Sequence, residues 1–290
     1  MPAEGALLAG ALLVDKPAGL TSHDVVARVR RAYRVRQVGH TGTLDPFATG
    51  LLVVLVGRPT RLARFVEAQA KTYLATARLG FATETDDLTG APVGDEVPVT
   101  AGEAEVRAAL EALAGAQAQR PPAYSAKRVA GERSYRLARR GEAVALADVT
   151  VTVHDITLVH YQPPLATFRT TVSAGTYVRA LARDLGERLG AGAHLTALRR
   201  ESIGGLRVED AVALGDLGPA TPLRPAGDVL AHLPRIELDA EGRRAVAHGR
   251  TVRDPSAAGG TVALVHDGAL AAVGEAAGGE IRPVVVLAEP

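Results

Sequence analysis

The sequence predicts an α+β fold: a mixed, mainly antiparallel sheet flanked by helices, followed by a small β-rich module at the C-terminal end. Strand-like and helix-like segments follow one another without the regular βαβ alternation of a doubly wound sheet. After residue 233 the pattern changes to short apolar runs separated by glycine-rich turns. Together these observations predict two domains, residues 1–232 and residues 233–290.

The first domain is expected to open with a strand over residues 11–14, which Asp15-Lys16-Pro17 ends. Thr21-Ser22-His23-Asp24 is a helix-start signature, because apolar residues recur after it at helical spacing. The elements that follow are expected to be a buried strand over 51–56, a short helix capped by Thr60, a strand over 72–79, a polar loop over 83–90, a helix over 102–114, a break over 115–123, a basic helix over 135–140, strands over 149–159 and 166–172, a helix over 178–189, a proline-rich linker over 215–234, and strands over 261–265, 269–273 and 284–287.

Composition limits the classes of protein to which the chain can belong. Apolar residues make up 47% of it, which supports a full core and excludes a disordered chain. There is no cysteine, so disulfides and thiolate metal sites are excluded. The apolar start over residues 5–14 is shorter than the roughly 20 residues that span a bilayer. We expect a cytoplasmic protein that does not need a membrane, and a monomer is the default.

Charge is unevenly distributed along the chain, although the net charge is only +1. Residues 1–75 hold ten Lys/Arg against five Asp/Glu, and residues 120–140 hold seven against one. Two basic segments in a nearly neutral protein indicate a surface that binds a polyanion. For residues 28–36 alone, an ordinary solvated helix face explains the arginines equally well.

Residues 39–52 are the most informative stretch of the chain. They place one carboxylate, Asp45, in a turn of small residues between a basic segment and an apolar run. Three glycines permit tight turns and the close approach of a ligand, and Pro46 biases Asp45 away from helix. A positioned carboxylate near arginine-rich segments indicates chemistry on an anionic molecule. An isolated Asp-Pro would indicate only an ordinary turn.

Four blocks of residues follow one another along the chain: Asp15-Lys16-Pro17 with Gly19, Thr21-Ser22 and Val25-Val26; Gly39 to Leu52; Lys71-Thr72-Tyr73 with Leu79-Gly80; and Gly175-Thr176-Tyr177-Val178-Arg179 with Leu181 and Asp184-Leu185-Gly186. With these four blocks in this order, the chain resembles the TruB-type tRNA pseudouridine synthases. A Leu-Arg-Arg segment, Leu198 to Arg200, follows. The resemblance extends over residues 11 to about 215. It implies a pseudouridine synthase catalytic domain, with a PUA-like RNA-binding module from residue 233.

The resemblance also implies a reaction and the residues that perform it. Uridine 55 in the T loop of tRNA becomes pseudouridine when the N1–C1′ bond breaks and C5 joins C1′, a reaction that requires no redox cofactor or metal. Asp45 takes the catalytic position, where it could attack C1′, add to C6 or remove the C2′ proton. Tyr73 would stack on the uracil, Arg179 would pair with Asp45, and Tyr177 and Leu198 would line the pocket. Apart from the resemblance, Leu198 and Tyr177 could equally be core residues, and Tyr73 could be a half-buried strand tyrosine. An ordinary surface arginine at a helix start is the alternative for Arg179, which the Gly-Thr-Tyr context disfavours.

A uridine inside a folded T arm must be flipped out, which costs on the order of a few kcal/mol in unstacking. By resemblance, His40 contacts the T-loop base pair that flipping disrupts; a turn histidine bonded to backbone or to Asp87 is the alternative. After Tyr124-Ser125-Ala126, Arg128 takes the place of a lysine that the family pattern would have. The residues expected to contact RNA, mostly through phosphates, are His40, Lys16, Arg28, Arg31, Arg128 and Arg136.

Other functions agree with some of these residues. An RNA-binding protein that remodels tRNA needs no buried carboxylate, so Asp45 with Tyr73 and Arg179 favours catalysis, with tRNA folding as an added role. Guide-RNA-dependent relatives usually have terminal extensions, so a stand-alone enzyme is expected. A glycoside hydrolase is disfavoured because no second carboxylate partners Asp45. A phosphate-binding loop is excluded because no Gly-x-x-x-x-Gly-Lys-Ser/Thr occurs.

Overall fold

A computed structural model describes residues 8–124, 128–129, 132–134, 140 and 146–289. The chain forms two compact units. Unit 1 consists of Met1–Gln69 together with Ile203–Pro290, and unit 2 consists of Ala70–Ser202. The predicted domain boundary between residues 232 and 233 does not coincide with the division into these units, because the residues on both sides of it belong to unit 1. This boundary stays a prediction.

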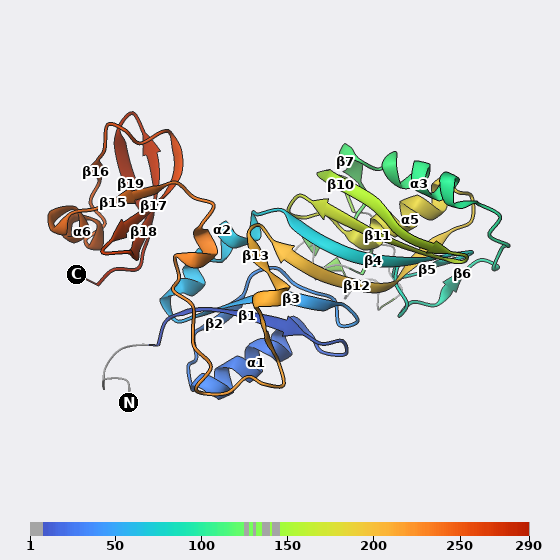
Figure 1. The fold of residues 1–290 in the computed structure, drawn as a ribbon, viewed down its shortest axis with the longest axis horizontal. Coiled ribbons are helices and arrows are strands. Elements are labelled where there is room, and N and C mark those ends of the chain that lie inside the picture. The colour runs from blue at the N-terminus through green and yellow to red at the C-terminus, as the bar shows by residue number, and fades with distance from the viewer. Residues whose placement is uncertain (1–7, 125–127, 130–131, 135–139, 141–145, 290) are drawn as a thin grey trace. The chain divides into compact units, whose positions relative to one another are not determined.

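Unit 1 contains a small mixed sheet with helix α1 (Ser22–Tyr33) beside it (Figure 1). Its strands, in sheet order, are β14 (Val212–Ala213), β1 (Gly10–Lys16), β3 (Thr49–Val56) and β2 (Val38–His40). β1 runs parallel to β14 and antiparallel to β3, and β2 is antiparallel to β3. Thr21 and Asp24 form a reciprocal capping box at the start of α1, as the helix-start signature predicts.

Strand β3 is apolar along nearly its whole length because both of its faces are covered. Leu52, Val54 and Val56 pack with the apolar face of α1. On the other face, Leu51, Val53 and Leu55 pack with buried residues of the 3-10 helix η1 (Arg58–Leu62), helix α2 (Ala63–Glu67) and 3-10 helix η3 (Asp228–Leu230). A continuous apolar run is what such a strand requires.

Two predictions for unit 1 are wrong in detail. Thr60 does not cap a helix: Gly57 is the N-cap of η1, and the Thr60 hydroxyl donates to the Gly57 carbonyl at 2.9 Å. Residues 215–234 are not a loose linker. Val229 and Leu230 are buried in the core, and Arg224 exchanges two backbone hydrogen bonds with Ala11 at 2.8 and 2.9 Å. The apolar residues between the prolines therefore belong to the packed structure.

The C-terminal part of unit 1 forms its own five-stranded sheet, as the short apolar runs between glycine-rich turns predict. Its strands, in sheet order, are β15 (Arg235–Glu237), β17 (Gly260–His266), β18 (Ala269–Ala277), β19 (Glu280–Val286) and β16 (Val252–Arg253). Helix α6 (Ala240–Ala247) was not expected from the sequence. Asp239 caps it by accepting from the Gly242 amide at 2.7 Å. Its one fully buried residue, Val246, is too little to produce a helical apolar pattern.

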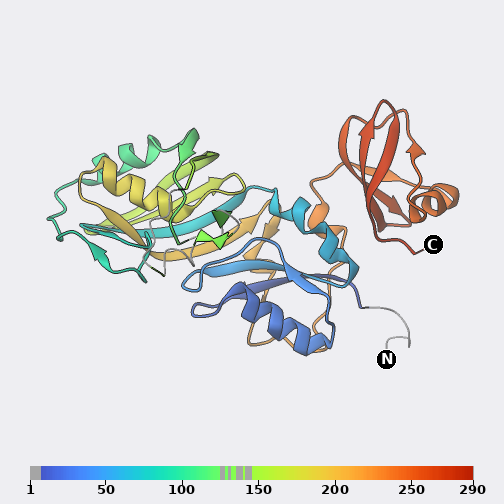
Figure 2. The same cartoon turned by 180° about the vertical axis from the view of Figure 1, so that it is seen from behind.

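Unit 2 is built on a larger, mainly antiparallel sheet. In sheet order its strands are β12 (Ala193–Ile203), β4 (Lys71–Leu79), β11 (Leu165–Val172), β10 (Val149–Gln162) and β7 (Gly115–Gln119). Helices α3 (Glu103–Glu111) and α5 (Val178–Arg188) pack together, α3 on β10 and α5 on β4 (Figure 2). The remaining short elements are β5 (Ala82–Thr83), β6 (Pro92–Val93), β8 (Arg128–Val129), β9 (Glu132–Arg133), β13 (Leu206–Arg207) and η2 (Val208–Asp210).

The predicted α+β class, with mixed and mainly antiparallel sheets flanked by helices, is confirmed. Strands β7 and β12 were missed. β7 is mostly exposed and consists of Gly, Ala and Gln, so its sequence has little strand character. The basic helix expected over 135–140 lies outside the described residues, except for Arg140. No helix among the described residues has the length and apolar character needed to cross a membrane.

Candidate active site

Asp45 lies half-buried in the turn between β2 and β3, and neighbouring residues hold this turn at both ends. Its carbonyl accepts from the Ala48 amide at 3.1 Å, and the Thr41 amide donates to the Val53 carbonyl at 2.9 Å. Ser22, the first residue of α1, accepts from the Leu44 amide through its hydroxyl at 2.9 Å. The residue before Asp45 is thus tied to the start of a helix, which fixes the carboxylate on a rigid support.

Lys16 has a different place from the one expected. Its side chain is fully buried, and its ammonium group donates to the carbonyls of Pro17, Leu20 and Pro46 at 2.9, 2.8 and 3.4 Å. Burying a charged amine costs free energy unless hydrogen bonds compensate for it. The expected RNA contact does not fit this burial. Lys16 instead joins the end of β1 to the carbonyl next to Asp45.

His40 ends β2, five residues before Asp45. Its ring lies edge-on to the ring of His23 in the first turn of α1, with centroids 5.4 Å apart and planes at 82°. His23 was not expected to touch it, since nothing in the local sequence links residues 17 positions apart. Arg28 and Arg31 lie exposed on α1, where phosphates can reach them. The side chain of Arg128 and all of Arg136 lie outside the described part of the chain.

In unit 2, Arg179 is buried in the first turn of α5 and is held by the loop over residues 83–90. Its guanidinium donates to Asp87 Oδ2 at 3.1 Å, to the Thr85 carbonyl at 3.0 Å and to the Tyr124 carbonyl at 3.1 Å. The Arg179 and Asp87 side chains are only 6% and 5% exposed. The other Asp87 oxygen accepts from the Thr85 hydroxyl, the Thr89 amide and the Thr89 hydroxyl.

The Asp87 carboxylate therefore has a complete set of hydrogen-bond donors in the loop and the helix. A buried ion pair is tolerated only when its remaining lone pairs and protons are satisfied in this way. The sequence does indicate the turn itself, because Thr-Asp-Asp-x-Thr-Gly is typical of an Asx turn. No local pattern indicates which arginine or lysine forms an ion pair with its carboxylate.

Tyr177 occupies the N-cap position of α5, and Gln119 holds its backbone from the end of β7. The Tyr177 amide donates to Gln119 Oε1 at 2.8 Å, and Gln119 Nε2 donates to the Tyr177 carbonyl at 3.2 Å. Gln119 is 1% exposed. This reciprocal pair fixes the start of the helix two residues before Arg179, and it was missed because Gln119 lies in a featureless Gln/Ala run.

Tyr73 and Leu198 lie on the neighbouring strands β4 and β12, and both are buried, at 7% and 8% exposure. Tyr73 pairs with Thr170 across the β4–β11 ladder. The structure therefore places Tyr73, Tyr177, Arg179 and Leu198 in unit 2, and Asp45 with His40 in unit 1. Among the described residues, no group of His, Asp and Glu has the arrangement of a metal site.

Comparison with known proteins decides the family. Residues 30–178 match the model described as the TruB family pseudouridylate synthase N-terminal domain, and residues 179–224 match that of the tRNA pseudouridylate synthase B C-terminal domain. The chain belongs to the TruB family. The predicted family, its pseudouridine synthase fold and its isomerase class are thereby confirmed.

Relatives of this TruB family member match over almost their whole length. A protein of Thermobifida fusca named tRNA pseudouridine synthase B is 46% identical, over 96% of this chain and 98% of the relative. A protein of the same name from Arthrobacter sp. is 42% identical, over 97% of each. Among solved structures, the archaeal box H/ACA sRNP Nop10–Cbf5 complex matches with a TM-score of 0.76 and 27% identity, over 100% of this chain and 89% of that one.

A second solved structure, an H/ACA RNP bound to a substrate RNA containing 2′-deoxyuridine, matches with a TM-score of 0.75 and 25% identity, over 96% of this chain and 85% of that one. Each unit holds candidate site residues on a fixed support. One unit fixes a carboxylate on a short loop. The other fixes the buried Arg179 guanidinium at the start of α5, where it forms an ion pair with Asp87 at 3.1 Å.

Proposed function

We propose that this protein converts uridine 55 in the T loop of tRNA to pseudouridine, as a stand-alone enzyme acting on the T arm. The observation that carries the substrate assignment is the match to relatives named tRNA pseudouridine synthase B at 42–46% identity over nearly the whole chain. The H/ACA structures are similar in fold but only 25–27% identical, which favours the stand-alone enzyme over a guide-dependent one. We also propose that it acts in the cytoplasm, where tRNA would be available, and as a monomer.

In the proposed reaction, the T arm binds and its uridine leaves the base stack. His40 contacts the pair that flipping disrupts, with His23 beside its ring. Asp45 acts on the flipped nucleotide while the N1–C1′ bond breaks, and the detached uracil turns in the pocket. C5 then joins C1′, the proton on C5 leaves, and N1, which has lost its bond to C1′, takes up a proton. In this proposal Tyr73 stacks on the base and its hydroxyl accepts the C5 proton.

Arg179 is proposed to pair with Asp45 and keep it ionised, because a nearby cation favours the charged carboxylate. Asp87 supports this role, since it holds the guanidinium from the side of the loop at 3.1 Å. Tyr177 and Leu198 would line the pocket. The β-rich module over residues 233–290 is proposed as PUA-like, with weak contact to tRNA because its charge is mildly acidic, six Lys/Arg against eight Asp/Glu.

The function can be tested with unmodified tRNA carrying tritium at uracil C5. Formation of pseudouridine replaces the C5–H bond, so we expect release of one equivalent of label per target uridine. A tRNA with cytidine at position 55, otherwise labelled in the same way, should release none. Tight, salt-sensitive tRNA binding without any release would contradict the catalytic proposal. It would favour a tRNA-folding or guide-dependent protein.

The surface of α1 provides a second prediction. Arg28→Gln with Arg31→Gln should weaken tRNA binding and leave kcat unchanged, because both exposed side chains would contact phosphate and not the reacting base. The slope of log Kd against log salt should fall by roughly one for each phosphate that the protein no longer neutralises. Arg207→Gln, a change at another exposed arginine of unit 1, is the control. An unchanged slope in the double variant would remove α1 from the RNA surface.

A further inference from the structure

A second arginine–aspartate pair lies one helical turn beyond Arg179. Arg183 Nη1 donates to Asp86 Oδ2 at 3.1 Å, and the two side chains are 11% and 12% exposed. The loop thus presents two consecutive carboxylates, Asp86 and Asp87, to two arginines four residues apart on α5. Residues at this spacing lie on the same face of a helix. Each carboxylate therefore has its own arginine.

The backbone at Asp86 makes this double attachment possible. Its φ is +58°, in the left-handed region that Asp and Asn adopt more readily than most other residues. The Leu195 amide donates to the Asp86 carbonyl at 3.0 Å, which also ties the loop to β12, the strand of Leu198. Burial raises the pKa of the Asp86 carboxyl, and the cations of Arg183 and Arg179 oppose that rise.

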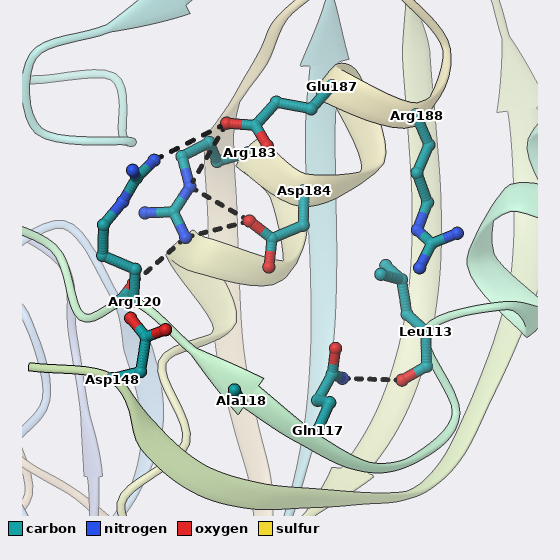
Figure 3. Close-up of a pocket in the computed structure, with 9 residues that line it drawn as sticks. All are labelled: Leu113, Gln117, Ala118, Arg120, Asp148, Arg183, Asp184, Glu187 and Arg188. Atoms are coloured by element: carbon teal, nitrogen blue, oxygen red, sulfur yellow. Dashed lines mark hydrogen bonds and ion pairs between the residues drawn. The ribbon is translucent and has the colours of Figure 1, made fainter.

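Every nitrogen of the Arg183 guanidinium has a partner, as Figure 3 shows in part. Nε and Nη2 donate to Asp184 Oδ1 at 3.0 and 2.9 Å, and Nη2 also donates to the Arg120 carbonyl at 3.0 Å. Arg120 follows Gln119, which holds the start of α5. Arg183 therefore connects the loop, the helix and the end of β7. A polar hollow of about 550 Å³ lies beside it, and none of the predicted site residues line that hollow.

We propose that Asp86 and Arg183 are positioning residues for the reaction. Together they orient the 83–90 loop so that Asp87 keeps the Arg179 guanidinium in the orientation required for its proposed role beside Asp45. Arg179 and the Leu195 amide already hold the loop at Thr85, Asp87 and the Asp86 carbonyl. The Arg183–Asp86 pair adds a side-chain attachment at the residue next to Asp87, on the same helix face, and so restricts the orientation of the loop further. Neither residue touches the substrate in this scheme. The inference rests on the proposed function, because it assigns Arg179 a role beside Asp45.

The test uses Asp86→Asn, which keeps the shape of the side chain and the tolerance for positive φ, and Arg183→Met, which keeps the apolar stem. Single-turnover rates at saturating tRNA should fall roughly tenfold in each, since misplacing a group by about 1 Å can cost 100-fold. The Kd for tRNA should stay within about twofold of wild type, because neither residue would contact RNA. The double variant should be no slower than Arg183→Met alone. Both changes remove the Arg183–Asp86 ion pair, and Arg183→Met also removes the contacts of Arg183 with Asp184 and the Arg120 carbonyl.

Glu187→Gln is the matched control. Glu187 also approaches Arg183, at 3.8 Å, but it is 61% exposed and does not reach the loop. Its rate should stay near that of wild type. Equal reductions in Glu187→Gln and Asp86→Asn would overturn the proposal, as would an unchanged rate in Asp86→Asn. A rise in the Kd for tRNA in Asp86→Asn or Arg183→Met that matches the fall in rate would overturn it too, because the pair would then be an RNA contact.

Amide hydrogen exchange of residues 83–90 separates this inference from the proposed function. In Asp86→Asn and Arg183→Met, exchange in the loop should be faster than in wild type, while exchange in β10 and β11 stays the same. This readout does not depend on turnover and also reports a variant that fails to fold. If wild type released no tritium yet the loop exchange changed as stated, the proposed function would fail and the attachment of the loop would stand.

Discussion

Asp45→Asn is expected to abolish pseudouridine formation while tRNA remains bound. The amide keeps the size of the side chain and its place in a turn held by Ser22 and Lys16, but it cannot act as a nucleophile or base. Turnover should fall more than roughly 1,000-fold, which is the decrease expected for a group that acts on the reacting atoms. Tritium release measures the rate, and filter binding measures the Kd.

The control is Asp216→Asn, which removes the same charge from an exposed position in unit 1. It separates a change in overall electrostatics from a change at the reacting atoms. A rate in Asp45→Asn close to that of wild type would remove the catalytic assignment. A large rise in Kd with a normal rate at saturation would make Asp45 a binding residue.

Arg179→Ala should cost both turnover and stability. It removes the cation that we propose orients Asp45, and it leaves the Asp87 side chain, which is 5% exposed, without the cation that compensates for its burial. Breaking such a buried pair from one side costs about 3–5 kcal/mol. We expect kcat to fall more than about 100-fold, the scale of misplacing or removing a fixed catalytic support. Thermal unfolding and single-turnover rates measure the two effects separately.

Arg179→Lys distinguishes charge from geometry. A single ammonium cannot reproduce the guanidinium contacts with Asp87, Thr85 and Tyr124, so turnover should stay low even though the charge is kept. Arg188→Ala, an exposed change at the far end of α5, is the control and should leave both quantities nearly unchanged. A folded Arg179→Ala variant that keeps its turnover would contradict the role of Arg179.

The sequence by itself determined the elements whose signals are local. The apolar run over 51–56 predicts a buried strand, and the structure shows why the run is continuous: each face of β3 packs in its own core. The Thr21 to Asp24 signature predicts the start of α1, because both residues of the capping box lie within four positions. It also determined which side chains are chemically notable, since Asp45, Tyr73 and Arg179 stand in motifs of recognisable spacing. These inferences needed no contact between distant parts of the chain.

Tertiary structure alone decided what these residues touch. Arg179 meets Asp87 across 92 positions, Arg183 meets Asp86 across 97, and Gln119 holds Tyr177 across 58. A lysine at the end of a strand looks the same in sequence whether it contacts phosphate or, like Lys16, donates to three carbonyls. The physical reason is that pairing of charges and amides depends on which strand and helix ends meet in space. Periodicity and spacing report only which residues face a core.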